Sequence, residues 1–256
     1  MAPQPPPETH RLAERLAHIA LADAVDELAL RRAETDAAKL MRADAAGGNA
    51  LLAVVAALRW DLDQMKRRYD LATRLRDSVY TRYDYSNTLA LVGEIDAAFA
   101  VARDALRRAP DNLRVLQRAI MAAVHVARFR EAEVLCDRWR KLSPQQEMPL
   151  RSTIASLVEA VERGVFSEAG ARKALRTASA VRCDAHMRIK GISIQPSVED
   201  PGEFVFEHAL IGTPSETADL NYTLACRWAD SPDLLEDPGM RFVPMFVARA
   251  SGGDDA

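Results

Sequence analysis

Two stretches of sequence, Gly93-Glu-Ile-Asp-Ala-Ala98 and Ala127-Arg-Phe-Arg-Glu-Ala132, decide the fold. They lie 34 residues apart, and Pro110 and Pro144 repeat the same spacing. In each stretch a small residue is followed by a bulky apolar residue and then by alanine. The small residue permits a tight turn, the alanine lets two helices approach closely, and the proline ends the second helix. The spacing therefore predicts two successive helical hairpins.

This pattern resembles the tetratricopeptide repeat (TPR) family over about residues 79–146, a quarter of the chain. The second helix of each unit matches the family best. In the first helix the chain departs from the family's Trp, Leu, Gly and Tyr positions, which are occupied here by Arg82, Tyr85, Ser86 and Leu89, then by Leu116, Ala119, Ile120 and Ala123. A third unit is indicated by Gly164-Val-Phe-Ser-Glu-Ala169, in which Ala169 follows Ala132 by 37 residues.

The resemblance implies a mode of action. In TPR proteins the first helices of successive units line a concave groove that binds an extended peptide or a helix. Carried over to this chain, the groove is lined by exposed positions of the first helices: Tyr80, Tyr83, Asn87, Arg114, Gln117, Arg118, Met121 and His125. Packing against a neighbouring hairpin is the alternative role for the tyrosines and Met121.

The region before the repeats is also helical. Residues 1–8 are rich in proline, and we expect a disordered tail there. Apolar periodicity predicts one long helix from about Thr9 to Ala46 and a second from about Ala50 to Arg82, with Gly47 and Gly48 ending the first and Asn49 capping the second. We therefore expect a long helical hairpin over residues 9–82. A packed pair of helices is the simpler interpretation, and a homodimer through this hairpin is the other.

Composition favours helices and a soluble protein. Alanine occurs 45 times, whereas glycine occurs only 11 times. No apolar run approaches the ~20 residues that span a bilayer, and the start lacks the features of a secretory signal. Three cysteines do not suggest a disulfide framework. We therefore expect a cytoplasmic protein that does not associate with membranes.

The charge balance and the residue composition both change near residue 190. Residues 81–190 carry 19 basic and 13 acidic side chains, whereas residues 191–256 carry 3 basic and 12 acidic ones. The two segments could face each other within the chain or across a dimer. The change predicts a boundary between TPR-like helical repeats over 83–186 and a separate C-terminal module over 187–249, followed by a disordered tail over 250–256.

Apolar and polar residues alternate in the C-terminal module, as they do in β-strands. Met187–Gln195 and Phe204–Ile211 read as two strands, joined by a turn at Glu199–Gly202. A helix begins after Thr213, with proline first and Glu216 third, and continues to about Ala229. Arg241–Val247 is a last strand, which Pro244 places at a sheet edge. The fold class is therefore mainly α, a TPR-like hairpin solenoid followed by a small α/β module of order ββαβ.

No pattern nominates catalytic, cofactor-binding or metal-binding residues. The chain lacks a glycine-rich phosphate loop, a G-x-S-x-G nucleophile elbow and an H-E-x-x-H zinc motif. Cys183 and His186 have a C-x2-H spacing, but His208 and Cys226 follow at distances that suit no compact zinc finger. We interpret these four residues as ordinary buried or surface side chains.

Three function classes follow from these observations. The first is a non-enzymatic scaffold or adaptor that binds another protein, as a peptide or a helix, in the TPR-like groove. The second is a nucleic-acid-associated regulator that uses the basic face of the repeats, although acidic residues interrupt that face. The third is an enzyme with a site between the repeats and the C-terminal module.

Overall fold

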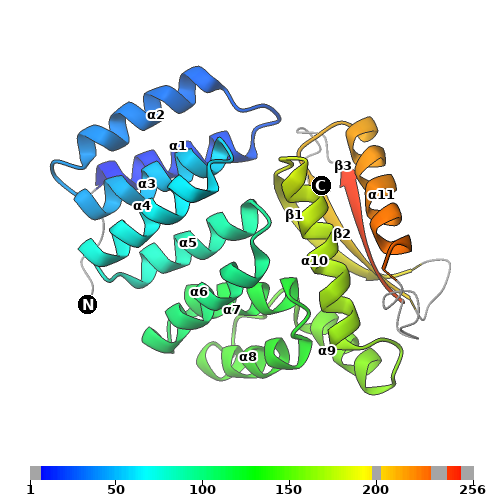
Figure 1. The fold of residues 1–256 in the computed structure, drawn as a ribbon. Helices are drawn as coiled ribbons and strands as arrows, with labels where there is room; N and C mark the ends of the chain where they lie inside the picture. The colour runs from blue at the N-terminus through cyan, green and yellow to red at the C-terminus, as the bar shows by residue number, and fades with distance from the viewer. Residues whose placement is uncertain (1–6, 198–202, 232–240, 249–256) are drawn as a thin grey trace. The chain divides into compact units, whose positions relative to one another are not determined.

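A computed structural model describes residues 7–197, 203–231 and 241–248. The chain divides into two compact units, Met1–Thr88 and Leu89–Ala256, and each is described by itself. The predicted tails and the predicted turn at Glu199–Gly202 lie almost wholly outside the described residues, although the first helix already begins at Pro7. The predicted fold class is confirmed: the described chain is mainly helical and ends in a small α/β module (Figure 1).

The first unit contains more and shorter helices than the two long ones predicted. Successive helices α1 to α4 pack against one another. The bounds are α1 (Pro7–Leu21), α2 (Glu27–Leu40), α3 (Ala45–Leu58) and α4 (Leu62–Leu75), followed by α5 (Val79–Leu91), which continues past the end of the unit. The prediction of two helices over Thr9–Ala46 and Ala50–Arg82 is therefore wrong.

Aspartate side chains cap the helices at the breaks that the apolar periodicity did not predict. Asp26 accepts hydrogen bonds from the amides of Leu28 and Ala29, and Asp44 and Asp61 accept one each from the amides of Gly47 and Gln64. Each bond satisfies an amide that has no partner within the first helical turn. Each short helix buries an apolar face, so the apolar periodicity of the sequence continues across the breaks.

The two glycines lie inside α3 rather than ending a helix. A Cβ atom on Gly48 would lie 2.5 Å from Met41 Cγ and 2.9 Å from the Ala37 carbonyl oxygen, so glycine permits the close approach of α2 and α3. Asn49 is buried within α3 and caps nothing; its side chain donates to the Ala45 carbonyl and accepts from Arg68. The cap of α3 is Asp44.

The second unit begins with the last residues of α5 and continues the helical series. Its helices pack in chain order, α6 on α7, α7 on α8 and α8 on α9. Their bounds are α6 (Ile95–Arg108), α7 (Leu113–His125), α8 (Phe129–Leu142), α9 (Arg151–Glu162) and α10 (Glu168–Asp184). This pairwise packing is that of a helical repeat.

Three turns in this series share one backbone geometry. Gly93, Ala127 and Gly164 all have positive φ, at +88°, +48° and +69°. In each turn the amide after this residue donates to a carbonyl five residues back: Glu94 to Leu89, Arg128 to Ala123 and Val165 to Ala160, each at 2.9 Å. This is the bond of a Schellman motif, which favours glycine or another small residue at the left-handed position. The left-handed turn thus explains the small residue of each predicted repeat, including Gly164 in the third repeat.

The C-terminal module has the predicted order ββαβ. Its elements are β1 (Ile189–Pro196), β2 (Phe204–Leu210), α11 (Pro214–Ala229) and β3 (Phe242–Ala248). The sheet order is β1-β2-β3, with β1 antiparallel and β3 parallel to β2. Thr213 and Glu216 form the predicted capping box. Pro244 lies on β3, an edge strand of the described sheet, which is where proline is tolerated.

A register shift between Ile189 and Gly191 explains the uneven spacing of isoleucines in β1. Ile189 is paired with Leu210 and Ile192 with His208, so the shift places both isoleucines on the same face although three residues separate them. The β2 residues on that face are Phe204, Phe206, His208 and Leu210, all of them buried. Phe242 of β3 packs on the start of α8 and on the connection before α10, since its ring centroid lies 5.7 Å from that of Phe129 and 5.3 Å from that of Phe166.

Candidate functional site

Helix α10 carries polar side chains that end on the termini of other helices. Glu168 accepts a hydrogen bond from the amide of Arg130 in the first turn of α8, at 2.9 Å. Arg172 donates to the carbonyl of Val126, directly after α7, at 3.0 Å. Arg176 forms a two-bond ion pair with Asp96 in the first turn of α6. The acid thus meets a helix N-terminus and Arg172 a helix C-terminus, as the helix dipole favours.

Arg182 makes the most buried of these contacts, with 1% of its surface exposed. Its Nη1 donates to the carbonyls of Leu91 and Met187, and its Nη2 donates to the carbonyl of Ala90. Ala90 and Leu91 are the last residues of α5, whose final carbonyls have no partner within the helix. A buried guanidinium therefore satisfies the end of α5 while its Nε has no hydrogen-bond partner.

A small cavity lies beside this guanidinium, at the junction of α7, α10 and the sheet. Its volume is about 10 Å³. Four polar residues line it, together with apolar ones: His125, Ser179, Arg182 and His208, with Ala90, Ile95, Ile189 and Phe206. We call the four polar residues the polar cluster.

The polar cluster contains buried polar atoms without hydrogen-bond partners. They are His125 Nε2, Ser179 Oγ, Arg182 Nε and both ring nitrogens of His208. Such atoms are rare in folded proteins, because each costs about 1–3 kcal/mol when it is left unpaired. Several of them around one cavity point to a bound partner of small size.

Both histidines are held neutral. Burial lowers the pKa of His125 to about 3, and the positive charges of Arg118 and Arg182 act in the same direction. Burial, Arg182 and His125 together lower the pKa of His208 far below its usual range. Both rings contact Phe206, and their centroids lie 6.3 Å (His125) and 5.0 Å (His208) from the centroid of its ring.

The residues predicted to line a groove fall in both units. Tyr80, Tyr83 and Asn87 lie on the part of α5 that belongs to the first unit. Tyr80 is exposed by 40%, and the other two are half-buried. Because the units are described separately, these three residues are not placed relative to the five on α7.

The five predicted residues on α7 separate into two groups. Arg114 and Gln117 are exposed, and Met121 is half-buried. Gln117 and Met121 follow Arg114 by three and seven positions, so all three residues lie on the same helix face. Arg118, in contrast, is only 9% exposed, and the Nε2 atom of His125 is buried in the polar cluster. The expectation that Arg118 and His125 are exposed side chains is therefore corrected, because these two positions face the interior of the second unit.

The four residues with metal-ligand chemistry do not converge. Cys183 is half-buried, His186 and Cys226 are exposed, and His208 faces the polar cluster. Within the described ranges, no three side chains of His, Cys, Asp or Glu are arranged to hold a metal ion.

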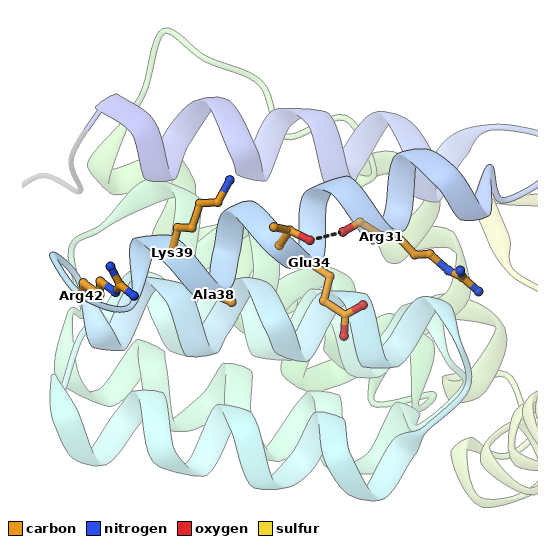
Figure 2. Close-up of a pocket in the computed structure, with 6 residues that line it drawn as sticks. Arg31, Glu34, Ala38, Lys39 and Arg42 are labelled. Atoms are coloured by element: carbon orange, nitrogen blue, oxygen red, sulfur yellow. Dashed lines mark hydrogen bonds between the residues drawn. The ribbon is translucent and has the colours of Figure 1, made fainter.

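A surface hollow in the first unit lies along α2 and the turn after it. Figure 2 shows Arg31, Glu34, Ala38 and Lys39 of α2 and Arg42 of the following turn around it, with charged side chains that extend in different directions rather than toward one point. Such a surface is an ordinary solvated helix face. None of the described helices combines the length and apolar character that a membrane crossing requires.

Sequence reasoning missed the polar cluster. Its members lie on α7, α10 and β2, up to 83 positions apart, and Arg182 belongs to a helix in which alanine and arginine alternate. The only signal was a histidine on an otherwise apolar strand face, at His208. Comparisons of the chain with protein-family models, with curated proteins and with solved structures find no match, so the description of this site rests on the structure itself.

Proposed function

We propose that this protein is a non-enzymatic interaction scaffold or adaptor whose helical repeats bind a segment of another protein, in the manner of the TPR family. The observation that carries the proposal is the repeated hairpin with its shared turn geometry at Gly93, Ala127 and Gly164. Stacked hairpins of this kind present successive helix faces at regular intervals, which suits the recognition of an extended segment.

The docking surface that we propose in the second unit is the face of α7 formed by Arg114, Gln117 and Met121, here called the α7 face. The remainder of α7 is almost entirely buried, so these are the positions from which this helix can reach a partner. Arginine offers charge-assisted hydrogen bonds, glutamine offers both a donor and an acceptor, and methionine offers adaptable apolar area.

The occupant that we propose is an acidic peptide segment. Residues 81–190, which include the α7 face, carry a net charge of +6. Arg114 at the start of the face favours a carboxylate there, and Met121 at its end favours an apolar side chain. The proposal extends to Tyr80, Tyr83 and Asn87 on α5 as a further contact region of the same kind.

A selection from a random peptide library tests the proposal. The full chain is the bait, and Arg114→Glu/Gln117→Ala is the variant that alters the α7 face. The matched control is Arg107→Glu, which makes the same charge change on α6 at a side chain that is 73% exposed. Circular dichroism of all three proteins establishes that the fold is retained.

We expect peptides enriched in Asp and Glu next to an apolar residue, with binding reduced at least tenfold by the α7 variant and unchanged by the control. Equal loss in both variants would show a non-specific charge effect. The absence of any enriched peptide, or enrichment that the α7 variant retains, would contradict the proposal.

A further inference from the structure

The cavity of the polar cluster limits its occupant by size. The space open to the centre of a water-sized sphere is only about 10 Å³, which leaves room for one occupant of roughly atomic size. A phosphate, a carboxylate or a nucleotide does not fit such a space. The occupant is therefore a monatomic ion or one water molecule.

Charge restricts the occupant further. The guanidinium of Arg182 lines the cavity and is buried, and the contacts of its nitrogens are three backbone carbonyls rather than a carboxylate. The positive charges of Arg118 and Arg182 both act on His125. A cation would be repelled from this position, whereas an anion would compensate a buried positive charge.

The hydrogen-bonding groups match the same conclusion. Arg182 Nε can only donate, Ser179 Oγ can donate, and a neutral imidazole always has one N–H group to donate. Arg182 Nε, Ser179 Oγ and one ring N–H of His208 can thus each donate to an acceptor in the cavity, and His125 Nε2 joins them in the tautomer that is protonated at that nitrogen. Ser179, Arg182 and His208 are each less than 5% exposed, so these donors lie within the protein rather than on its surface.

We propose that the polar cluster is a binding site for a single halide ion, chloride under physiological conditions, held by Arg182, Ser179, His125 and His208. The ion would complete the hydrogen bonding at the junction of α7, α10 and the sheet. It would thereby stabilise the contact between the C-terminal module and the helices of the second unit. The proposal is independent of the peptide-binding function.

The test uses the full chain, freed of chloride by dialysis into gluconate buffer. The melting temperature is measured as sodium chloride or sodium bromide replaces gluconate at constant ionic strength and neutral pH. Ser179→Ala removes one donor with little change in volume, and Ser156→Ala makes the same change at an exposed position of α9. Crystals grown in bromide are examined for anomalous scattering in the cavity.

We expect a saturable rise of the melting temperature with either halide, a several-fold weaker apparent affinity in Ser179→Ala and no change in Ser156→Ala. An anomalous bromide peak in the cavity would locate the ion directly. Identical melting temperatures in gluconate and chloride, or a cavity that holds only water in the bromide crystals, would overturn the proposal.

Discussion

The turns at Gly93 and Gly164 have the same backbone but different surroundings. Both residues have positive φ, and in both turns the following amide bonds a carbonyl five residues back at 2.9 Å. A Cβ atom on Gly93 would lie 3.1 Å from the Ser179 carbonyl oxygen and 3.2 Å from Arg182 Nη2, whereas a Cβ on Gly164 would have no atom within 4 Å. The first turn is covered by α10, and the other is open.

This difference separates two roles of the same repeat position. The open turn needs glycine only because of its φ. The covered turn needs glycine for φ and also for the close approach of α10, which brings Arg182 to the end of α5. The sequence repeat therefore specifies the conformation of both turns. The packing of α10, which the repeat does not specify, determines how much stability is lost when the glycine is replaced.

The largest effect is expected from Arg182→Met, which keeps the apolar stem and removes the guanidinium. Three backbone carbonyls each lose a hydrogen bond from a charged donor, one of these bonds being fully buried, so we expect a loss of about 3–5 kcal/mol in the free energy of unfolding. Chemical denaturation measures this loss. Arg163→Met, at a side chain that is 72% exposed, is the control and should change little. A loss below about 1 kcal/mol in Arg182→Met would contradict the role of this residue.

A pH effect of similar size is expected from the two histidines beside the covered turn. Their pKa values are lowered in the fold, to about 3 for His125. Below the ordinary histidine pKa of about 6.5 the unfolded chain binds more protons than the folded chain. Stability should therefore fall as the pH is lowered from about 6.5, by about 1.4 kcal/mol per pH unit for each histidine.

Denaturation of the wild type and of His208→Leu between neutral pH and about pH 5, in gluconate buffer free of halide, measures this contribution. The variant removes one of the two groups, so its stability should fall less steeply, by about 1.4 kcal/mol per pH unit. Ser156→Ala changes an exposed side chain that does not titrate and should leave the slope as it is. Equal slopes in the wild type and His208→Leu would show that His208 is not held neutral.

A smaller effect is expected from Gly93→Ala. Alanine at this φ costs about 1–2 kcal/mol, and the contacts at 3.1 and 3.2 Å must also widen. We expect a total loss of about 2–3 kcal/mol, measured by denaturation. A loss no greater than that of the same substitution in the open turn would argue against the cover by α10.

The smallest effect is expected from Gly164→Ala, which introduces only the backbone strain. We expect a loss of about 1 kcal/mol, because the new methyl group enters open space. The difference between the two glycine variants, rather than either value alone, measures the contribution of α10.

The sequence predicted those parts of the fold in which local chemistry repeats or is distinctive. The 34-residue spacing located the turns at Gly93 and Ala127, and Thr213 with Glu216 located the start of α11. The break between α3 and α4 was missed because bulky Trp60 occupies the left-handed position after α3, at φ +60°. A tryptophan there gives no turn signal, although Asp61 directly after it is a common cap residue.

The polar cluster could not be predicted in the same way. Arg118 and Arg182 read as exposed charges in amphipathic helices, and only their packing against other elements buries them. His208 alternates correctly with Phe206 on a buried strand face, but its neighbours in space come from α7 and α10. Contacts between residues this far apart in sequence follow from the packing of whole elements, which no local pattern specifies.

Residue-resolved hydrogen exchange of the full chain tests the central claim most directly, that α10 covers one turn of the repeat and leaves the equivalent turn open. The probes are the amides of Glu94 and Val165, which make the same 2.9 Å bond in the two turns. The account predicts much slower exchange at Glu94 than at Val165, and an Arg182→Met variant in which exchange accelerates at Glu94 alone. Equal protection of the two amides, or equal acceleration of both in the variant, would contradict it.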